Sequence, residues 1–87
     1  MITVFISGKC PDCPPAIQAF ENSDLDYDII DITENMSNLK KFLKYRDFHP
    51  YFDAIKASGK VGIPTIMIGD GEKFIEFDET LNLNKLK

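Results

Sequence analysis

Apolar residues alternate along the chain between strand-like runs and helical spacing, and the order of these segments predicts the fold. Residues 2–6 (Ile-Thr-Val-Phe-Ile) are apolar and β-branched, as expected of a buried strand. Helical spacing follows from residue 13 or 14 to about residue 23, with Ile17 and Phe20 on the buried face. A second strand-like run covers residues 27–32. A strand, a helix and a strand in this order predict parallel pairing with a right-handed crossover.

The middle of the chain has the spacing of two further helices. One is predicted over about residues 36–46, after a stretch rich in helix-capping residues. The His49-Pro50 pair interrupts it, and a shorter helix is expected around residues 51–56. Gly59 suits the C-terminal end of that helix, because glycine adopts a left-handed conformation without strain.

The last third of the chain is typical of a β-hairpin followed by a helix. Residues 64–68 and 73–77 flank an Asp-Gly pair, which is a common hairpin turn. Asp78 or Thr80 is expected to cap a final helix. That helix would carry Leu81, Leu83 and Leu86.

Together these elements predict a single α/β domain over residues 1–87. A parallel strand–helix–strand unit and an antiparallel hairpin give a four-stranded mixed sheet flanked by helices. The length of 87 residues is enough for one modest core. A hydrophobic fraction of 44% with 28% charged residues is typical of a folded globular chain.

The charge balance argues against a nucleic-acid partner. The formal net charge is −4, and the basic cluster of Lys40, Lys41, Lys44 and Arg46 is interpreted as a solvated helix face. The sequence contains no apolar run long enough to span a membrane, and no signal peptide is recognised after Met1. We therefore expect a cytoplasmic protein with no membrane association, and a monomer.

The most informative motif is Cys10-Pro11-Asp12-Cys13, directly after the first strand. It contains both cysteines of the chain. In a small cytoplasmic protein such a pair is more often reactive than structural, and a disulfide across so short a loop would restrain the unfolded chain little. A helix start favours negative charge and so stabilises a thiolate, which is the form that attacks disulfides. The leading interpretation is therefore a redox dithiol.

With this motif and the later Gly62-Ile63-Pro64-Thr65 segment, the chain resembles the glutaredoxins. It is most similar to short bacterial glutaredoxin-related proteins with a Cys-Pro-Asp-Cys-Pro motif. The resemblance extends over the whole chain through its element order, and it implies a thioredoxin-like fold and an electron-transporting thiol-disulfide oxidoreductase. It also implies a cis peptide bond between Ile63 and Pro64 facing the dithiol, with the Ile63 main chain free to pair with a bound thiol peptide.

The resemblance implies roles for the residues around the dithiol. Cys10 is the expected nucleophile, and Cys13 is the more shielded thiol that resolves the mixed disulfide and forms the redox-active disulfide with Cys10. Pro11 would fix the turn, and Lys9 would add positive charge beside Cys10. Asp12 acts in the opposite direction, because a carboxylate disfavours a nearby thiolate.

Glutathione is the expected co-substrate, with no bound cofactor and no metal. Members of the family usually carry a lysine three positions before the first cysteine, where this chain has Ser7, so Lys9 is the available substitute. They also carry a Gly-Gly pair before the last helix, where this chain has Glu76-Phe77. The acidic pair Asp78-Glu79 is retained, and Asp78 would either receive the glutathione amino group or cap the helix.

Three alternatives stay open. The first is a thioredoxin-like electron donor, for example to ribonucleotide reductase, recycled by a thioredoxin-type reductase instead of glutathione. The second is a metal-binding module in which Cys10 and Cys13 hold zinc or an iron–sulfur cluster shared between subunits. The third is a regulatory domain with little catalysis. In either redox case the substrate is a disulfide-containing protein or a small thiol compound.

The remaining chemistry-bearing side chains are assigned structural roles. His49 is expected in a surface loop, because thiol exchange at a helix start needs no added base. A group of aromatic residues is interpreted mainly as packing, with the alternative that one of them lines the substrate groove: Tyr45, Phe48, Tyr51 and Phe52.

Overall fold

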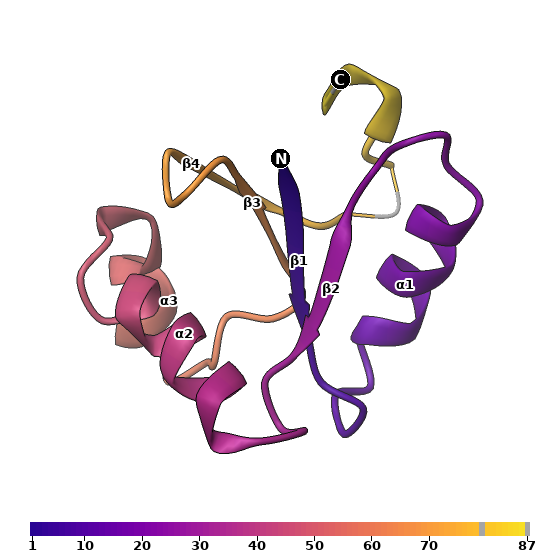
Figure 1. Cartoon of the computed structure of the whole chain (residues 1–87). Helices are drawn as coiled ribbons and strands as arrows, with labels where there is room; N and C mark the ends of the chain where they lie inside the picture. Colours follow the sequence, from indigo (N-terminus) through magenta and orange to yellow (C-terminus); the bar gives the residue numbers. More distant parts are fainter. Residues whose placement is uncertain (79, 87) are drawn as a thin grey trace.

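A computed structural model describes residues 1–78 and 80–86 of the chain, and in them four strands form one mixed sheet (Figure 1). The strands are β1 (Ile2–Ile6), β2 (Asp28–Asp31), β3 (Thr65–Ile68) and β4 (Lys73–Glu76), in the order β2-β1-β3-β4. β1 runs parallel to β2 and antiparallel to β3, and β3 forms a hairpin with β4. The predicted thioredoxin-like arrangement of a parallel unit and a hairpin is therefore confirmed.

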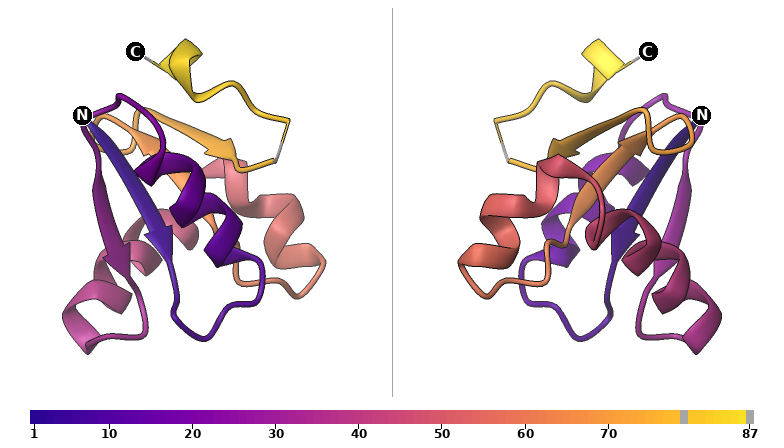
Figure 2. Two further views of the ribbon diagram at one scale, coloured as in Figure 1. Left: turned by 90° about the vertical axis from the view of Figure 1, so that its right-hand side faces the viewer. Right: turned by 90° about the vertical axis from the view of Figure 1, so that its left-hand side faces the viewer.

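Helices cover both faces of this sheet. α1 (Cys13–Glu21) lies on one face, and α2 (Met36–Arg46) lies on the other with α3 (Asp53–Ala57) (Figures 1 and 2). The 3-10 helix η1 (Pro50–Phe52) leads directly into α3. None of the helices in the described ranges is long and apolar enough to cross a membrane.

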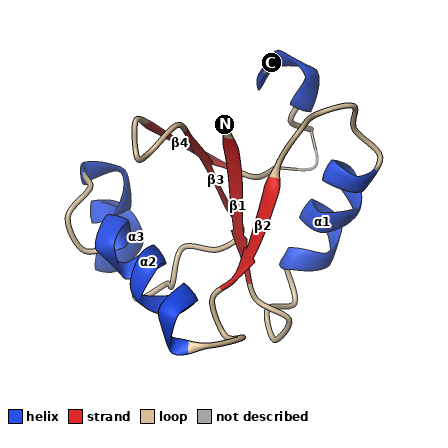
Figure 3. Cartoon of the chain, viewed as in Figure 1, coloured by secondary structure: helices blue, strands red, loops and turns tan. Residues whose placement is uncertain are grey.

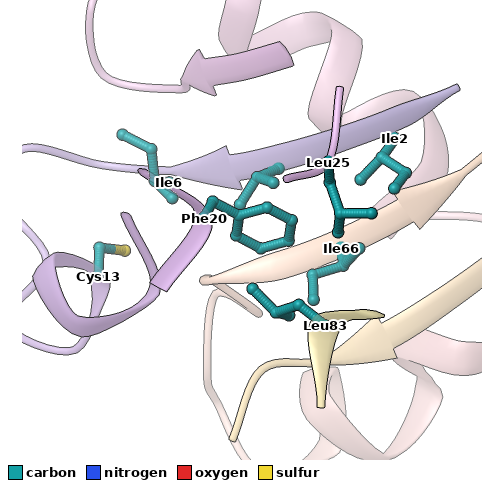
Figure 4. Packing of buried hydrophobic residues seen from close by; sticks show 8 residues of the cluster. Ile2, Ile6, Cys13, Phe20, Leu25, Ile66 and Leu83 are labelled. Carbon is teal, nitrogen blue, oxygen red and sulfur yellow. The ribbon is translucent and has the colours of Figure 1, made fainter. Parts of the chain in front are cut away.

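β1 is buried throughout and apolar except for Thr3, because both of its faces are covered. Successive side chains of a strand point to opposite faces. Accordingly, Ile2, Val4 and Ile6 belong to the cluster under α1, where Phe20 is fully buried (Figure 4). Phe5 belongs to a second cluster on the opposite face, with buried residues from the turn after β2, the helices and the hairpin: Ile32, Phe42, Phe52, Met67 and Phe74.

Local sequence signals set the ends of the helices. α1 begins at Cys13 because Pro14 and Pro15 fit its first turn, where a backbone N–H has no partner in the helix. α3 ends in a Schellman motif at Gly59, the residue predicted to end this helix. In that motif Gly59 has φ +78°, its N–H donates to Lys56, and the next N–H donates to the Ile55 carbonyl oxygen at 3.1 Å.

The expected final α-helix is wrong, since the chain instead forms the short 3-10 helix η2 (Leu83–Leu86). Leu81 and Leu83 are two positions apart, so one face of an α-helix could not present both to the core. Both nevertheless pack against the cluster under α1, which requires a more extended path before η2. The Asp78 carboxylate accepts hydrogen bonds from the Thr80 N–H and hydroxyl, so it caps a turn rather than a helix. Glu79, the other member of the acidic pair, lies outside the described residues.

Candidate active site

The loop between β1 and α1 (Figure 3) contains Cys10, which precedes the first helical residue, Cys13, by three positions. The Cys10 N–H donates to the Ser7 carbonyl oxygen at 3.1 Å, and the Cys13 N–H donates to the Cys10 carbonyl oxygen at 3.3 Å. Pro14 and Pro15 lack an N–H, so the first turn of α1 offers few further donors. Cys10 is partly exposed and precedes the N-terminal end of α1, which is the positive end of the helix dipole.

Cys13 is fully buried behind Cys10, and both are free thiols. The Ser7 N–H donates to Cys13 Sγ at 3.5 Å. Burial, together with a hydrogen bond between the Cys13 and Cys10 thiols, raises the pKa of Cys13 to about 12. Cys13 is thus a protonated thiol at neutral pH, in hydrogen-bonding reach of the accessible sulfur.

A groove of about 730 Å³ opens beside Cys10 and brings most of the predicted site together. Residues of the dithiol loop line one part of it, and the peptide bond between Ile63 and Pro64 on another part is cis, as the resemblance implied. Every predicted site residue except the buried Cys13 lies along this groove: Lys9, Cys10, Pro11, Ile63, Pro64 and Asp78.

Ile63 lines the groove beside the cis peptide bond. Its side chain packs against both core clusters, which fixes the residue to the body of the protein. In the part of the chain that the structure describes, its N–H and C=O make no hydrogen bond. An extended substrate segment could pair with these groups in the manner of an added strand.

The dithiol loop is fixed by residues that the motif did not reveal. The buried Ser7 hydroxyl lies 2.8 Å from the Thr33 hydroxyl and accepts the Lys9 N–H at 3.0 Å. Asp31 accepts the Gly8 N–H at 3.1 Å and the Thr33 N–H at 2.8 Å. A sequence signal for Asp31 does exist, because it ends the strand parallel to β1, and the carboxyl ends of parallel strands meet at one edge.

Acid is expected to weaken the Asp31 anchor. Hydrogen bonds from the Thr33 hydroxyl and backbone, and from the Gly8 N–H, hold the pKa of Asp31 below its ordinary range. Because the folded-state value is lowered, the carboxylate stabilises the fold above its unfolded value of about 4, and this contribution is lost as the pH falls through the folded value.

Denaturant unfolding of wild type and Asp31→Asn over this pH range tests the anchor. The variant should be less stable at neutral pH, and the difference should narrow below about pH 4. Asp78 also has a lowered pKa, because of hydrogen bonds from Thr80. It is present in both proteins, so its titration cancels in the difference between their unfolding free energies. A difference in unfolding free energy that stays constant with pH contradicts the role given to Asp31.

Tyr51 is the aromatic residue, among those considered from the sequence, that lines the groove. Burial raises the pKa of its hydroxyl, with Glu76 nearby acting in the same direction and a hydrogen bond with Thr65 opposing it. Tyr51 is therefore a neutral hydrogen-bonding group beside the residue that follows Pro64. His49 is half-buried rather than in an open surface loop, and its Nδ1 accepts the Tyr51 N–H at 3.1 Å.

Charged side chains of both signs line the groove. Lys9 and Lys60 supply positive charge, and Asp12, Glu76 and Asp78 supply negative charge. Phe77 lines the groove between the last two carboxylates, so the positions where the family usually has glycines carry full side chains here. At the end of β4, the Glu76 and Phe77 side chains therefore occupy space that glycines would leave open to a ligand.

One alternative left open by the sequence is a metal or cluster held by Cys10 and Cys13. The described residues contain no group of three or more His, Cys, Asp or Glu side chains placed to hold one metal ion. A structural zinc site needs about four such ligands.

Comparisons with known proteins agree with the geometry. The sequence model of the glutaredoxin family matches residues 2–75. The chain is also 36% identical over 84 residues to an uncharacterized protein of Haemophilus influenzae, a match that covers 97% of this chain and 91% of that protein. No solved structure matches significantly.

Proposed function

The chain belongs to the glutaredoxin family of thiol-disulfide oxidoreductase-like proteins, and from this premise we propose that it reduces disulfides through a Cys10–Cys13 dithiol cycle. One observation carries the proposal. An accessible cysteine at a helix start is hydrogen-bonded to a buried, protonated cysteine, beside a groove able to hold a substrate.

The proposed cycle transfers two electrons in two exchange steps. The Cys10 thiolate attacks one sulfur of the substrate disulfide, forms a mixed disulfide and releases the other sulfur as a thiolate, which takes up a proton. Cys13 then gives up its proton and attacks Cys10 Sγ. The Cys10–Cys13 disulfide forms as the second substrate thiol leaves, so the substrate is reduced and the dithiol is oxidised.

The mixed disulfide itself assists the second step. Burial is the largest cause of the raised pKa of Cys13, but the hydrogen bond with Cys10 and the charge of Cys10 contribute in the same direction. Once Cys10 is bonded to the substrate, both of these contributions disappear. Deprotonation of Cys13 thus becomes easier at the stage that requires it.

Glutathione is the proposed reductant of the oxidised protein. Family membership supports this assignment, as do Lys9 and Asp78 on the groove, which could bind a carboxylate and an amino group. Ser7 does not take the place of the usual lysine, because its side chain is buried against Thr33. The second candidate, a donor recycled by a thioredoxin-type reductase, is favoured by the Glu76 and Phe77 side chains on the groove.

A glutathione-reductase-coupled assay with a small glutathione mixed disulfide separates the two reductants. Steady turnover supports glutathione, whereas single-turnover reduction without recycling supports the reductase-dependent donor.

Glu76→Gln should raise kcat/KM for the anionic tripeptide by about three- to tenfold, because like charges repel in a shared groove.

The matched control for this variant is Glu34→Gln, which removes an exposed carboxylate that does not line the groove. It should leave kcat/KM within about twofold of wild type. If both variants raise kcat/KM equally, the effect reflects net charge, and Glu76 does not restrict glutathione.

A further inference from the structure

The segment that leads into Ile63 is held on one side by α3 and η1. The Lys60 N–H donates to the Ile55 carbonyl oxygen at 3.1 Å. Gly62 has φ +106°, and a Cβ at this position would lie 3.2 Å from the Phe52 ring and 3.3 Å from Ile55 Cγ2. The backbone therefore approaches the helices as closely as glycine permits.

Arg46, the last residue of α2, holds the same segment from the other side. Its Nε donates to the Val61 carbonyl oxygen at 2.7 Å, and its Nη2 donates to the Lys60 carbonyl oxygen at 2.8 Å. Two successive carbonyl groups thus converge on one edge of the guanidinium. The planar guanidinium fork donates to such a pair from two nitrogens in a fixed geometry, whereas a lysine would have to reach both carbonyl groups from one nitrogen.

The environment of Arg46 differs from that of a solvated lysine. Its side chain is only 22% exposed, and Nη1 lies 3.8 Å from the carboxylate of Asp47. Within the described residues it does not line the groove, so it has no direct contact with a substrate there. The interpretation of the basic cluster as a solvated face is therefore wrong for Arg46.

We propose that Arg46 is a positioning residue for substrate docking. By fixing the carbonyl groups of residues 60 and 61, it sets the direction of the main chain through Gly62 to Ile63, where a substrate segment would pair. The inference rests on the proposed function, because it concerns docking of the disulfide substrate to the same groove. Through Arg46, the end of α2 thus fixes the position of a segment that begins 14 residues further along the chain.

Reduction of a short peptide disulfide by wild type, Arg46→Lys and Arg46→Ala tests this inference. Both variants should lower kcat/KM by about tenfold, mainly through a higher KM, because a displaced docking segment binds the substrate less well. Alkylation of Cys10 by iodoacetamide needs no docking and should stay within about twofold of wild type. Amide hydrogen exchange at Gly62 and Ile63 should become faster in both variants.

Lys56→Ala is the matched control. Lys56 Nζ donates to the Asp47 carbonyl oxygen at 2.9 Å, so it also joins α3 to the end of α2 and carries the same charge, but it does not bind residues 60–62. It should leave the kcat/KM for the peptide unchanged. Equal kcat/KM values for wild type and both Arg46 variants would overturn the inference alone. A wild-type protein that is alkylated at Cys10 but reduces no disulfide would contradict the proposed function, and this inference with it.

Discussion

Replacing Cys10 with serine is expected to abolish disulfide reduction, with kcat/KM lower by about a thousandfold or more. A serine hydroxyl stays protonated at neutral pH and cannot form a mixed disulfide. Cys13 cannot take over the attack, because it is fully buried, and burial is the largest cause of its raised pKa. The measurement is the rate at which each protein reduces a peptide disulfide under pseudo-first-order conditions.

Cys13→Ser is the matched control for this prediction. It keeps Cys10 and therefore the first exchange step, but it lacks the thiol that resolves the mixed disulfide. A mixed disulfide with the peptide should accumulate on Cys10 and be visible by mass. If Cys10→Ser retains a tenth of the wild-type rate, Cys10 is not the attacking group.

Replacing Phe42 with alanine is expected to lower the free energy of unfolding by about 3–5 kcal/mol, because a cavity replaces a large buried ring. Phe42 is fully buried, and its ring centroid lies 5.1 Å from that of Phe5 and 5.8 Å from that of Phe52. It joins α2 to the central strand and to η1. Since domains of this size are stable by only about 5–15 kcal/mol, the loss should be plain in a urea titration.

Phe48→Ala removes the same ring from the loop after α2 and serves as its control. Phe48 is 84% exposed, so the unfolding free energy should change by no more than about 0.5 kcal/mol. Similar losses in the two variants would contradict the assignment of Phe42 to the core.

Elements with a strong local pattern could be predicted from the sequence. The run at residues 2–6 carries apolar side chains on both faces because it forms a central strand. Pro14-Pro15 predicted a helix start at residue 13 or 14, and α1 begins at Cys13. The end of the chain could not be predicted in this way. Its leucines are placed by contacts with the cluster under α1, and these contacts overrode the tendency expected of a capped helical segment.

In the active site too, residues within one local motif could be predicted from the sequence, whereas residues brought together by the fold were harder to predict. Cys10, Pro11 and Cys13 were recognisable because they form one contiguous motif. The supports of the site lie outside that motif, because Asp31 reaches Gly8 across 23 positions and Arg46 reaches Val61 across 15. The sequence signals Asp31 only through its place at the end of the strand parallel to β1. Arg46 in particular follows the helical spacing of exposed lysines, and only the folded chain shows that its fork meets two carbonyl groups.

The most direct test of the dithiol cycle is to equilibrate the wild-type protein with glutathione redox buffers, quench it with acid and measure its mass. The proposed chemistry predicts conversion to a species lighter by two hydrogen atoms, with the disulfide mapping to Cys10 and Cys13 and any glutathione adduct mapping to Cys10. A protein that stays fully reduced at every buffer composition, or that carries its adduct on Cys13, would contradict it.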